Sequence, residues 1–189
     1  MSMGYSLREL GQQSADVIDN FQRIEPRPWT ERILALELCG EVGSLTHAIL
    51  AMEGYKRRRP SLAAVKNECA DVLFVVLRLA GYCGLLLPEG VQASLSWEVE
   101  CPSAIVGVGL ELSQLAGEVA AHVTGEGSIL LLDTLLCMVA LVESVAKHYR
   151  FSLRDAYLSE LGVCRLWQAK SLASSRWQQR LLRWFGKAG

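Results

Sequence analysis

The chain has 189 residues, enough for one domain or for two small halves that share a hydrophobic core. Its formal net charge is −1, so no overall field favours binding to nucleic acid or to an anionic membrane. Hydrophobic residues make up 51% of the chain, and the mean hydropathy of +0.22 favours helices that are buried on more than one side.

The N-terminal residues MSMGYSLREL contain no apolar signal core. The six cysteines show no CxxC spacing, and most of them lie within apolar helical segments. We therefore expect reduced core thiols in the cytoplasm rather than disulfides or a zinc site.

The chain is predicted to be nearly all helix, because apolar residues recur at helical spacing and strand-like alternation is absent. Thr30, Ser61 and Ser152 are expected to cap three of the helices. Two prolines in the segment Glu25–Trp29 separate the first two helices, and Gly54 is expected to end the second. The expected helices cover residues 6–23, 30–52, 62–80, 104–123, 129–149 and 152–171, with a further short helix that ends near Trp97.

The longest apolar stretch, Ile129–Ala146, is about as long as a short membrane span. Asp133 and Glu143 interrupt it, and acids within a membrane are costly, so we interpret it as a buried bundle helix and expect no membrane span. The tail Arg176–Lys187 is a basic amphipathic segment. Docking on the bundle or fraying is the more common behaviour of such a tail, and contact with a membrane or a partner is the alternative.

An internal repeat divides the expected helices into two halves. In each half a Leu-Glu-Leu motif precedes a glycine at the same spacing, a loop with an acid and a glycine follows, and a long apolar helix then carries an aspartate. These features are Leu36–Leu38, Glu53–Gly54 and Asp71 in the first half, and Leu110–Leu112, Glu126–Gly127 and Asp133 in the second. We therefore predict one helical unit over residues 1–97, a degenerate repeat over 103–175, and the tail over 176–189.

Carboxylates on two of the expected helices suggest a metal site. Glu37 and Glu41 lie one turn apart on the second helix, and Glu68 and Asp71 lie one turn apart on the third. Two such faces brought together hold a hard cation through oxygen ligands alone, and such a cation suits a phosphate-bearing ligand. The alternative is a solvated acidic face, but the apolar neighbours of Glu68 and Asp71 make an uncompensated pair expensive.

The motifs GEVGSL at residues 40–45 and ECADVL at residues 68–73 resemble the MazG-like, all-α nucleoside triphosphate pyrophosphohydrolase superfamily. The signature of that family is E-x-x-E, a spacer, and E-x-x-D. By position, Glu41, Glu68 and Asp71 match the first, third and fourth acids, while Ser44 replaces the second. The resemblance implies a Mg²⁺ site, with Mn²⁺ as the alternative ion. It also implies cleavage of a nucleoside triphosphate to the monophosphate and pyrophosphate.

The resemblance assigns roles to these acids. Glu41, Glu68 and Asp71 bind the metal, and Glu41 or Glu68 also orients the attacking water. For the missing acid, our hypothesis is that Glu37, one turn before Glu41, reaches the metal directly or through water. Members of the family often carry Lys, Asn and Arg on the last short helix to bind phosphate, whereas residues 90–100 of this chain contain none of these.

A basic run between the two acidic helices is the candidate substitute for phosphate binding. Its members are Lys56, Arg57, Arg58 and Arg59. A solvated loop is the equally weighted alternative for this run. Arg165 and Lys170 are further candidates in the second half.

The resemblance implies an all-α, MazG-like helical bundle in which two repeated units form a pseudo-dimer, and this chain is expected to pair once more as a homodimer. In the second half Asp133 matches Asp71, but Leu130 replaces the first acid of E-x-x-D, so a structural role is favoured there. Three functions stay open: a Mg²⁺-dependent nucleoside triphosphate pyrophosphohydrolase, a degenerate protein that binds nucleotide or metal without turnover, and a structural helical interaction module. The three acids at family spacing favour the first, and Ser44 with the missing phosphate-binding helix favours the second.

Overall fold

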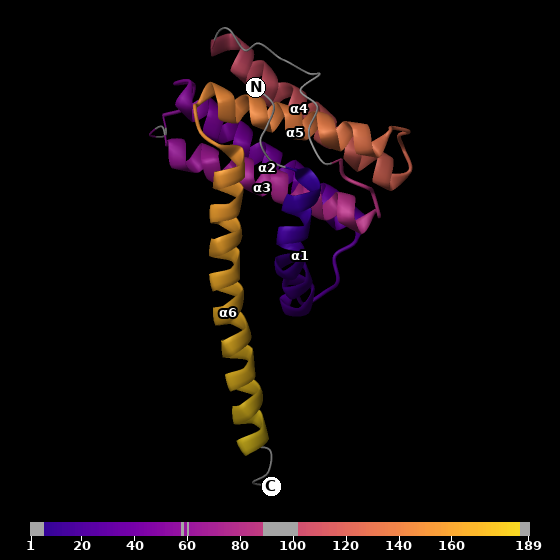
Figure 1. Cartoon of the computed structure of the whole chain (residues 1–189), viewed down its shortest axis with the longest axis vertical. Helices are drawn as coiled ribbons and strands as arrows, with labels where there is room; N and C mark the ends of the chain where they lie inside the picture. Colours follow the sequence, from indigo (N-terminus) through magenta and orange to yellow (C-terminus); the bar gives the residue numbers. More distant parts are fainter. Residues whose placement is uncertain (1–5, 58, 60, 89–101, 186–189) are drawn as a thin grey trace.

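The computed structural model describes residues 6–57, 59, 61–88 and 102–185, with side chains described from 105 to 172 in the last of these ranges. Six helices and no strand occur in these residues, which confirms the all-α class and agrees with a helical bundle. The helices are α1 (Leu7–Ile24), α2 (Glu31–Met52), α3 (Leu62–Tyr82), α4 (Pro102–Thr124), α5 (Leu131–His148) and α6 (Leu153–Phe185) (Figure 1). The short helix predicted to end near Trp97 lies outside the described residues.

Side-chain caps set the start of four helices. The hydroxyls of Ser6, Thr30 and Ser61 accept hydrogen bonds from the backbone N–H three residues later, at 3.3, 3.4 and 3.2 Å. Ser152 accepts in the same way from the N–H of Asp155 at 3.2 Å. Each cap satisfies a backbone donor that the first turn of a helix leaves without a partner, so the predicted caps at Thr30, Ser61 and Ser152 are confirmed.

Gly54 ends α2 as predicted. Its φ of +80° lies in the left-handed region, where glycine has no steric cost, and the N–H of Tyr55 returns to the carbonyl of Leu50 at 2.8 Å. Arg150 occupies the corresponding position after α5 with a φ of 57°. This conformation costs a residue with a Cβ roughly 1–2 kcal/mol, so contacts with the surrounding residues must stabilise the turn between α5 and α6.

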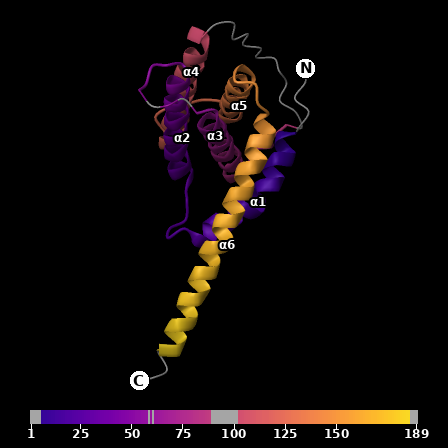
Figure 2. The ribbon, with the colours of Figure 1, turned by 90° about the vertical axis from the view of Figure 1, so that its left-hand side faces the viewer.

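The last helix is longer than the sequence pattern indicates. The pattern predicts an end at Ser171, but α6 continues to Phe185 and includes most of the predicted tail. Residues 172–185 contain neither proline nor glycine, and Gly186 is the first residue that favours a stop. Figures 1 and 2 show this second part of α6 extending away from the other helices.

Helix α3 lies at the centre of the bundle and packs against α1, α2, α5 and α6, while α2 packs between α3 and α4 (Figure 2). The crossing of α2 and α4 is antiparallel. Cys39 of α2 donates to the carbonyl of Ala116 at 3.6 Å, whereas Thr46 donates to that of Gly109 at 3.4 Å. The two helices that carry the Leu-Glu-Leu motifs therefore face each other directly.

One described helix, α2, is long enough and apolar enough to cross a membrane by length and composition alone. The core helix of a soluble protein passes the same test. In the bundle, the buried residues of α2 include Leu38, Val42 and Leu45, which belong to the common hydrophobic core. The expectation of no membrane span stays a prediction.

The two Leu-Glu-Leu motifs have the same burial pattern. Leu38 and Leu112 have no exposed surface, whereas Leu36 and Leu110 are 68% and 73% exposed. Replacing either inner leucine with alanine is expected to lower the free energy of unfolding by about 2–5 kcal/mol, because it leaves a cavity in the core. Replacing either outer leucine is expected to change it by less than about 0.5 kcal/mol.

Urea unfolding of the four single variants, followed by circular dichroism, measures these differences. Equal losses for the inner and outer leucines of one motif would contradict the orientation of that helix in the bundle.

Candidate metal centre

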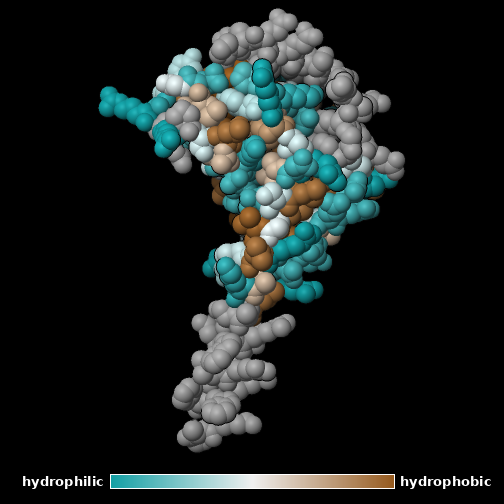
Figure 3. All heavy atoms as spheres, turned by 60° about the vertical axis from the view of Figure 1, so that its left-hand side comes forward, coloured by the Kyte–Doolittle hydropathy of each residue, from teal (hydrophilic) through white to brown (hydrophobic). Residues whose placement is uncertain are grey.

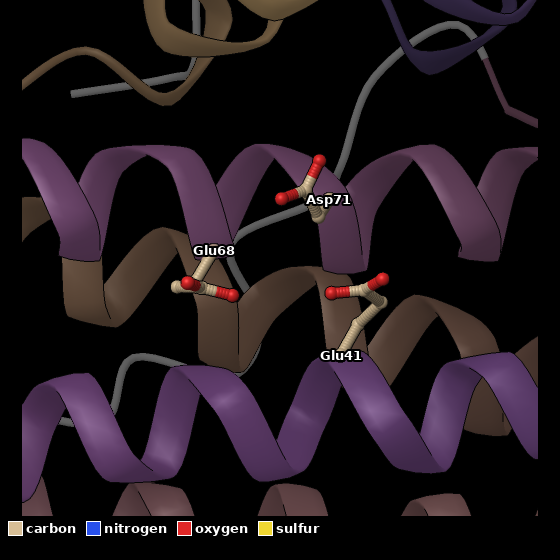
Figure 4. Close-up of side chains that lie close together, drawn as sticks. All are labelled: Glu41, Glu68 and Asp71. Atoms are coloured by element: carbon tan, nitrogen blue, oxygen red, sulfur yellow. The ribbon is translucent and has the colours of Figure 1, made fainter.

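Three carboxylates from two helices converge beside α3. Glu41 projects from α2 toward Glu68 and Asp71 of α3, as Figure 4 shows. One oxygen from each side chain lies within 4.8 Å of the others, and all three residues are half-buried. Glu68 and Asp71 share a face of α3 because they lie three residues apart, and the packing of α2 against α3 brings Glu41 to that face. The three acids predicted to bind metal are therefore neighbours in space.

A cavity of about 250 Å³ opens beside this cluster, between α1, α2, α3 and α6. Its lining includes five acids: Glu25, which pairs with Arg78, and Glu37, Glu41, Asp71 and Glu160. Along α3 the lining then passes from Asp71 to Arg78, two turns further on, among aromatic side chains. Glu68 is not among the described lining residues, so the carboxylate cluster lies at the margin of the cavity.

Two acids that line the cavity, Glu41 and Asp71, have raised pKa values. Burial, followed by the charges of Glu41, Glu160, Glu68 and Glu37, raises the pKa of Asp71 from 3.8 to about 7. Burial also raises the pKa of Glu41, and the charges of Glu37 and Glu68 add to that effect. Neither Glu41 nor Asp71 forms an ion pair with a described lysine or arginine. A cation at this point would relieve the repulsion that the side chains leave uncompensated.

The donor set fits a hard divalent cation, because every candidate ligand atom is a carboxylate oxygen. Two oxygens bound to the same Mg²⁺ lie at most about 4.2 Å apart, since each bond is about 2.1 Å long. A spread of up to 4.8 Å therefore requires a small inward movement of the side chains, or water between one carboxylate and the ion. Partly hydrated sites with one or two direct carboxylates are usual for Mg²⁺.

The other end of the cavity is built around a buried guanidinium. Arg78 is 4% exposed and donates to Glu25 at 3.2 Å. Its guanidinium carbon lies 4.1 Å from the ring centre of Trp29 and 5.8 Å from that of Phe21. Phe74 meets Phe21 edge to face, at a centroid distance of 6.0 Å. Aromatic faces and a charged planar group thus lie about two turns of α3 from the carboxylates.

The structure places the remaining predicted residues differently. Glu37 lines the same cavity but stands outside the group of three converging oxygens. Ser44, at the position of the missing acid, is exposed and is not among the described lining residues.

The predicted phosphate-binding run does not contact the cavity in the part that the structure describes. Lys56, Arg57 and Arg59 are exposed in the loop between α2 and α3, and none of them is among the described lining residues. Arg58 and residues 90–100 lie outside the described ranges. Arg165, a further candidate, forms two 3.0 Å hydrogen bonds to the carboxylate of Asp16 and is occupied there.

Glu160 is the site residue that the sequence did not reveal. It lies on α6, lines the cavity, and after Glu41 is the strongest charge acting on the pKa of Asp71. It is 89 residues from Asp71 and belongs to no acidic motif, so only the packing of α6 against α3 brings it to the site.

The second half shows no equivalent cluster among the residues that the structure describes. Asp133, which the predicted repeat matches with Asp71, is exposed near the start of α5. Asp133 and Glu111 both raise the pKa of Cys137 after the larger effect of burial, so each lies near that thiol, but they form no group of three acids within the described ranges.

Comparison of the chain with protein-family models, curated proteins and solved structures finds no match.

The raised pKa of Asp71 makes the stability of the metal-free protein depend on pH. Between about 4 and 7 the folded protein holds a proton that the unfolded chain releases, so the free energy of unfolding falls as pH rises through this range. Asp71→Asn removes the effect. Above pH 7 the variant is expected to be more stable than the parent by about 1–2 kcal/mol after solvent screening, with little difference at pH 4.

Urea titrations at several pH values in the presence of a chelator measure this difference. Asp19→Asn, on the exposed side of α1, is the matched control and should follow the parent at every pH. An Asp71→Asn curve parallel to that of the parent would show that Asp71 is not held in a repulsive environment.

Proposed function

We propose that the protein is a Mg²⁺-dependent nucleoside triphosphate pyrophosphohydrolase, which releases a nucleoside monophosphate and pyrophosphate. The observation that carries the proposal is the convergence of Glu41, Glu68 and Asp71 within 4.8 Å at the margin of a cavity. The cavity combines two kinds of surface, acids at one end and aromatic rings with Arg78 at the other. A nucleotide has the matching parts, a metal-binding phosphate chain and a planar base.

In this proposal Glu41, Glu68 and Asp71 hold the ion, and Glu37 and Glu160 add negative charge from the cavity wall. The bound ion would polarise the phosphoryl oxygens and lower the pKa of a water molecule. Glu41 or Glu68 would accept a hydrogen bond from the attacking water and direct it toward phosphorus. The half-buried position of these carboxylates strengthens each of these interactions, because solvent screens them less than it would at the surface.

The proposal includes the duplicated, MazG-like organisation of the chain. Two observations support it: α2 and α4 cross in antiparallel orientation, and the Leu-Glu-Leu motifs of the two helices have the same buried and exposed positions. A two-fold axis that runs perpendicular to two equivalent helices makes them cross in antiparallel orientation. Pairing of the whole chain as a homodimer stays a prediction.

A second candidate function is binding of metal or nucleotide without turnover. Arg78 is the one cation among the described lining residues, and its ion pair with Glu25 already occupies it. A triphosphate carries several negative charges, so a cavity lined by five acids and one paired arginine favours a metal-bridged ligand over rapid catalysis. Ser44 also favours binding without turnover, because it is exposed and supplies no charge to the cavity.

Pyrophosphate release from a panel of ribo- and deoxyribonucleoside triphosphates with Mg²⁺ or Mn²⁺ tests the proposed reaction. Asp71→Ala is expected to lower kcat by roughly 100-fold or more, because it removes a ligand from the centre of the cluster. Asp133→Ala, at the equivalent position of the second half, is the matched control and should retain the parental rate. Equal rates for the two variants would contradict a site in the first half.

The variant Ser44→Glu separates turnover from binding alone. If the parent binds Mn²⁺ but releases no pyrophosphate, while Ser44→Glu releases it, the chain is a binding protein that has lost one acid. If electron paramagnetic resonance detects no Mn²⁺ binding by the parent, the structural helical interaction module is the candidate function that remains.

Glu160 supplies a separate test of the cavity. Glu160→Gln removes one negative charge near Asp71 and is expected to weaken Mn²⁺ binding by about 3- to 10-fold, which corresponds to roughly 1 kcal/mol. Glu126→Gln, in the exposed loop after α4, changes the same charge far from the cavity and should leave the affinity unchanged. Isothermal titration with Mn²⁺ measures both variants.

A further inference from the structure

Helix α6 has two parts with different surroundings. Its first part is fastened to α1, because Arg165 bonds to Asp16 and the side-chain amide of Gln168 donates to the carbonyl of Val17 at 2.8 Å. Its second part continues as helix to Phe185 and extends beyond the bundle (Figures 1 and 2). The whole helix has 33 residues, longer than packing on the bundle requires.

An apolar arc begins where α6 leaves the bundle. Val163 and Leu166 are 55% and 66% exposed, and Figure 3 shows hydrophobic surface in this region. Trp167 is 50% exposed, and its ring stacks on Phe21 of α1 at a centroid distance of 5.8 Å. At about 100° per residue, Leu166 and Trp167 both lie within about 60° of Val163 around the helix axis. By the same register the arc continues along the helix through residues that the sequence supplies as Trp177, Leu181, Trp184 and Phe185. We call this set the apolar arc.

The charge of the chain changes sign at the same place. Residues 161–189 contain six lysines and arginines and no acid, whereas residues 1–160 contain the other 13 basic residues and all 20 acids. The two regions thus carry formal charges of +6 and −7. By register, Arg176, Arg180 and Arg183 lie about 100° or more from Val163, on the side away from the apolar arc, whereas Lys170 lies within about 20° of Val163. Arg165 also lies on the far side and is paired with Asp16.

We propose that the apolar arc of α6 docks on an anionic lipid bilayer, with the helix lying in the plane of the interface. A segment with tryptophan and leucine on one face and arginine on the other has the properties of interfacial helices. Three of the five tryptophans of the chain, Trp167, Trp177 and Trp184, lie on the arc, and tryptophan rings favour the headgroup region. Anionic headgroups also attract the basic residues of this segment, by about 1 kcal/mol for each one near the membrane surface.

Charge distinguishes this occupant from a second copy of the chain. Two copies of α6 would bring two segments of +6 together, and like charges oppose that contact. An anionic bilayer instead attracts α6 and repels the bundle, whose formal charge is −7.

Flotation of the full chain with vesicles tests the proposal. The parent is expected to float with an equal mixture of phosphatidylcholine and phosphatidylglycerol, but not with phosphatidylcholine alone. Leu181→Glu places an acid on the apolar arc and should weaken binding by about tenfold or more. Gln179→Glu adds the same charge about 160° from Val163, on the opposite side of the helix, and should weaken it by no more than about threefold.

Three results would overturn the proposal: no flotation of the parent with the anionic vesicles, equal losses for the two variants, or lipid-free self-association that Leu181→Glu abolishes. The second result would indicate a purely electrostatic attraction, and the third a second copy as the occupant of the arc. Circular dichroism of both variants controls for folding. The proposal does not rest on the pyrophosphohydrolase activity, which is measured without lipid and should be the same in both variants.

Discussion

Helix α3 is buried along most of its length, and this burial constrains the parts of the molecule around it. Eleven of its 21 residues are buried, so the helix has little surface on which a charged side chain can reach water. A charge on such a helix must find a partner, or its pKa must shift toward the neutral form. Both outcomes occur on α3, two turns apart.

Arg78 and Asp71 face the same cavity with opposite electrostatic results. Arg78 pairs with Glu25 and lies against Trp29, so the protein itself compensates its charge. Asp71 is surrounded by other acids, and its pKa rises to about 7. In the proposed metal site, a bound cation would relieve this repulsion, so the raised pKa of Asp71 and the proposed cation binding have the same electrostatic origin.

The sequence predicts the local features well, because they depend on residues close together in the chain. The hydroxyls of Thr30, Ser61 and Ser152 cap helices at the expected positions, and Gly54 ends α2. The convergence of Glu41 with Glu68 and Asp71 is also predictable, since it follows from two neighbouring helices and their spacing.

The features that the sequence does not predict depend on contacts between distant segments. Glu160 reaches the cavity because α6 packs against α3, and no local sequence pattern indicates that packing. Arg165 is a candidate for phosphate binding by sequence, yet it pairs with Asp16 of α1. The basic charge of residues 172–185 suggests a separate tail, whereas the absence of a helix-stopping residue decides where α6 ends.

The cavity has a consequence for the order of events during synthesis. Its wall joins Phe21 of α1 to Glu160 of α6, and α1 and α6 are fastened together at Asp16 and Val17. A nascent chain still attached to the ribosome within α6 has Glu41, Glu68 and Asp71 outside the exit tunnel but lacks the wall that shields them from water. The three acids are then more solvated and repel each other less. The cavity is complete only after the helix made some 90 residues later has packed against α3.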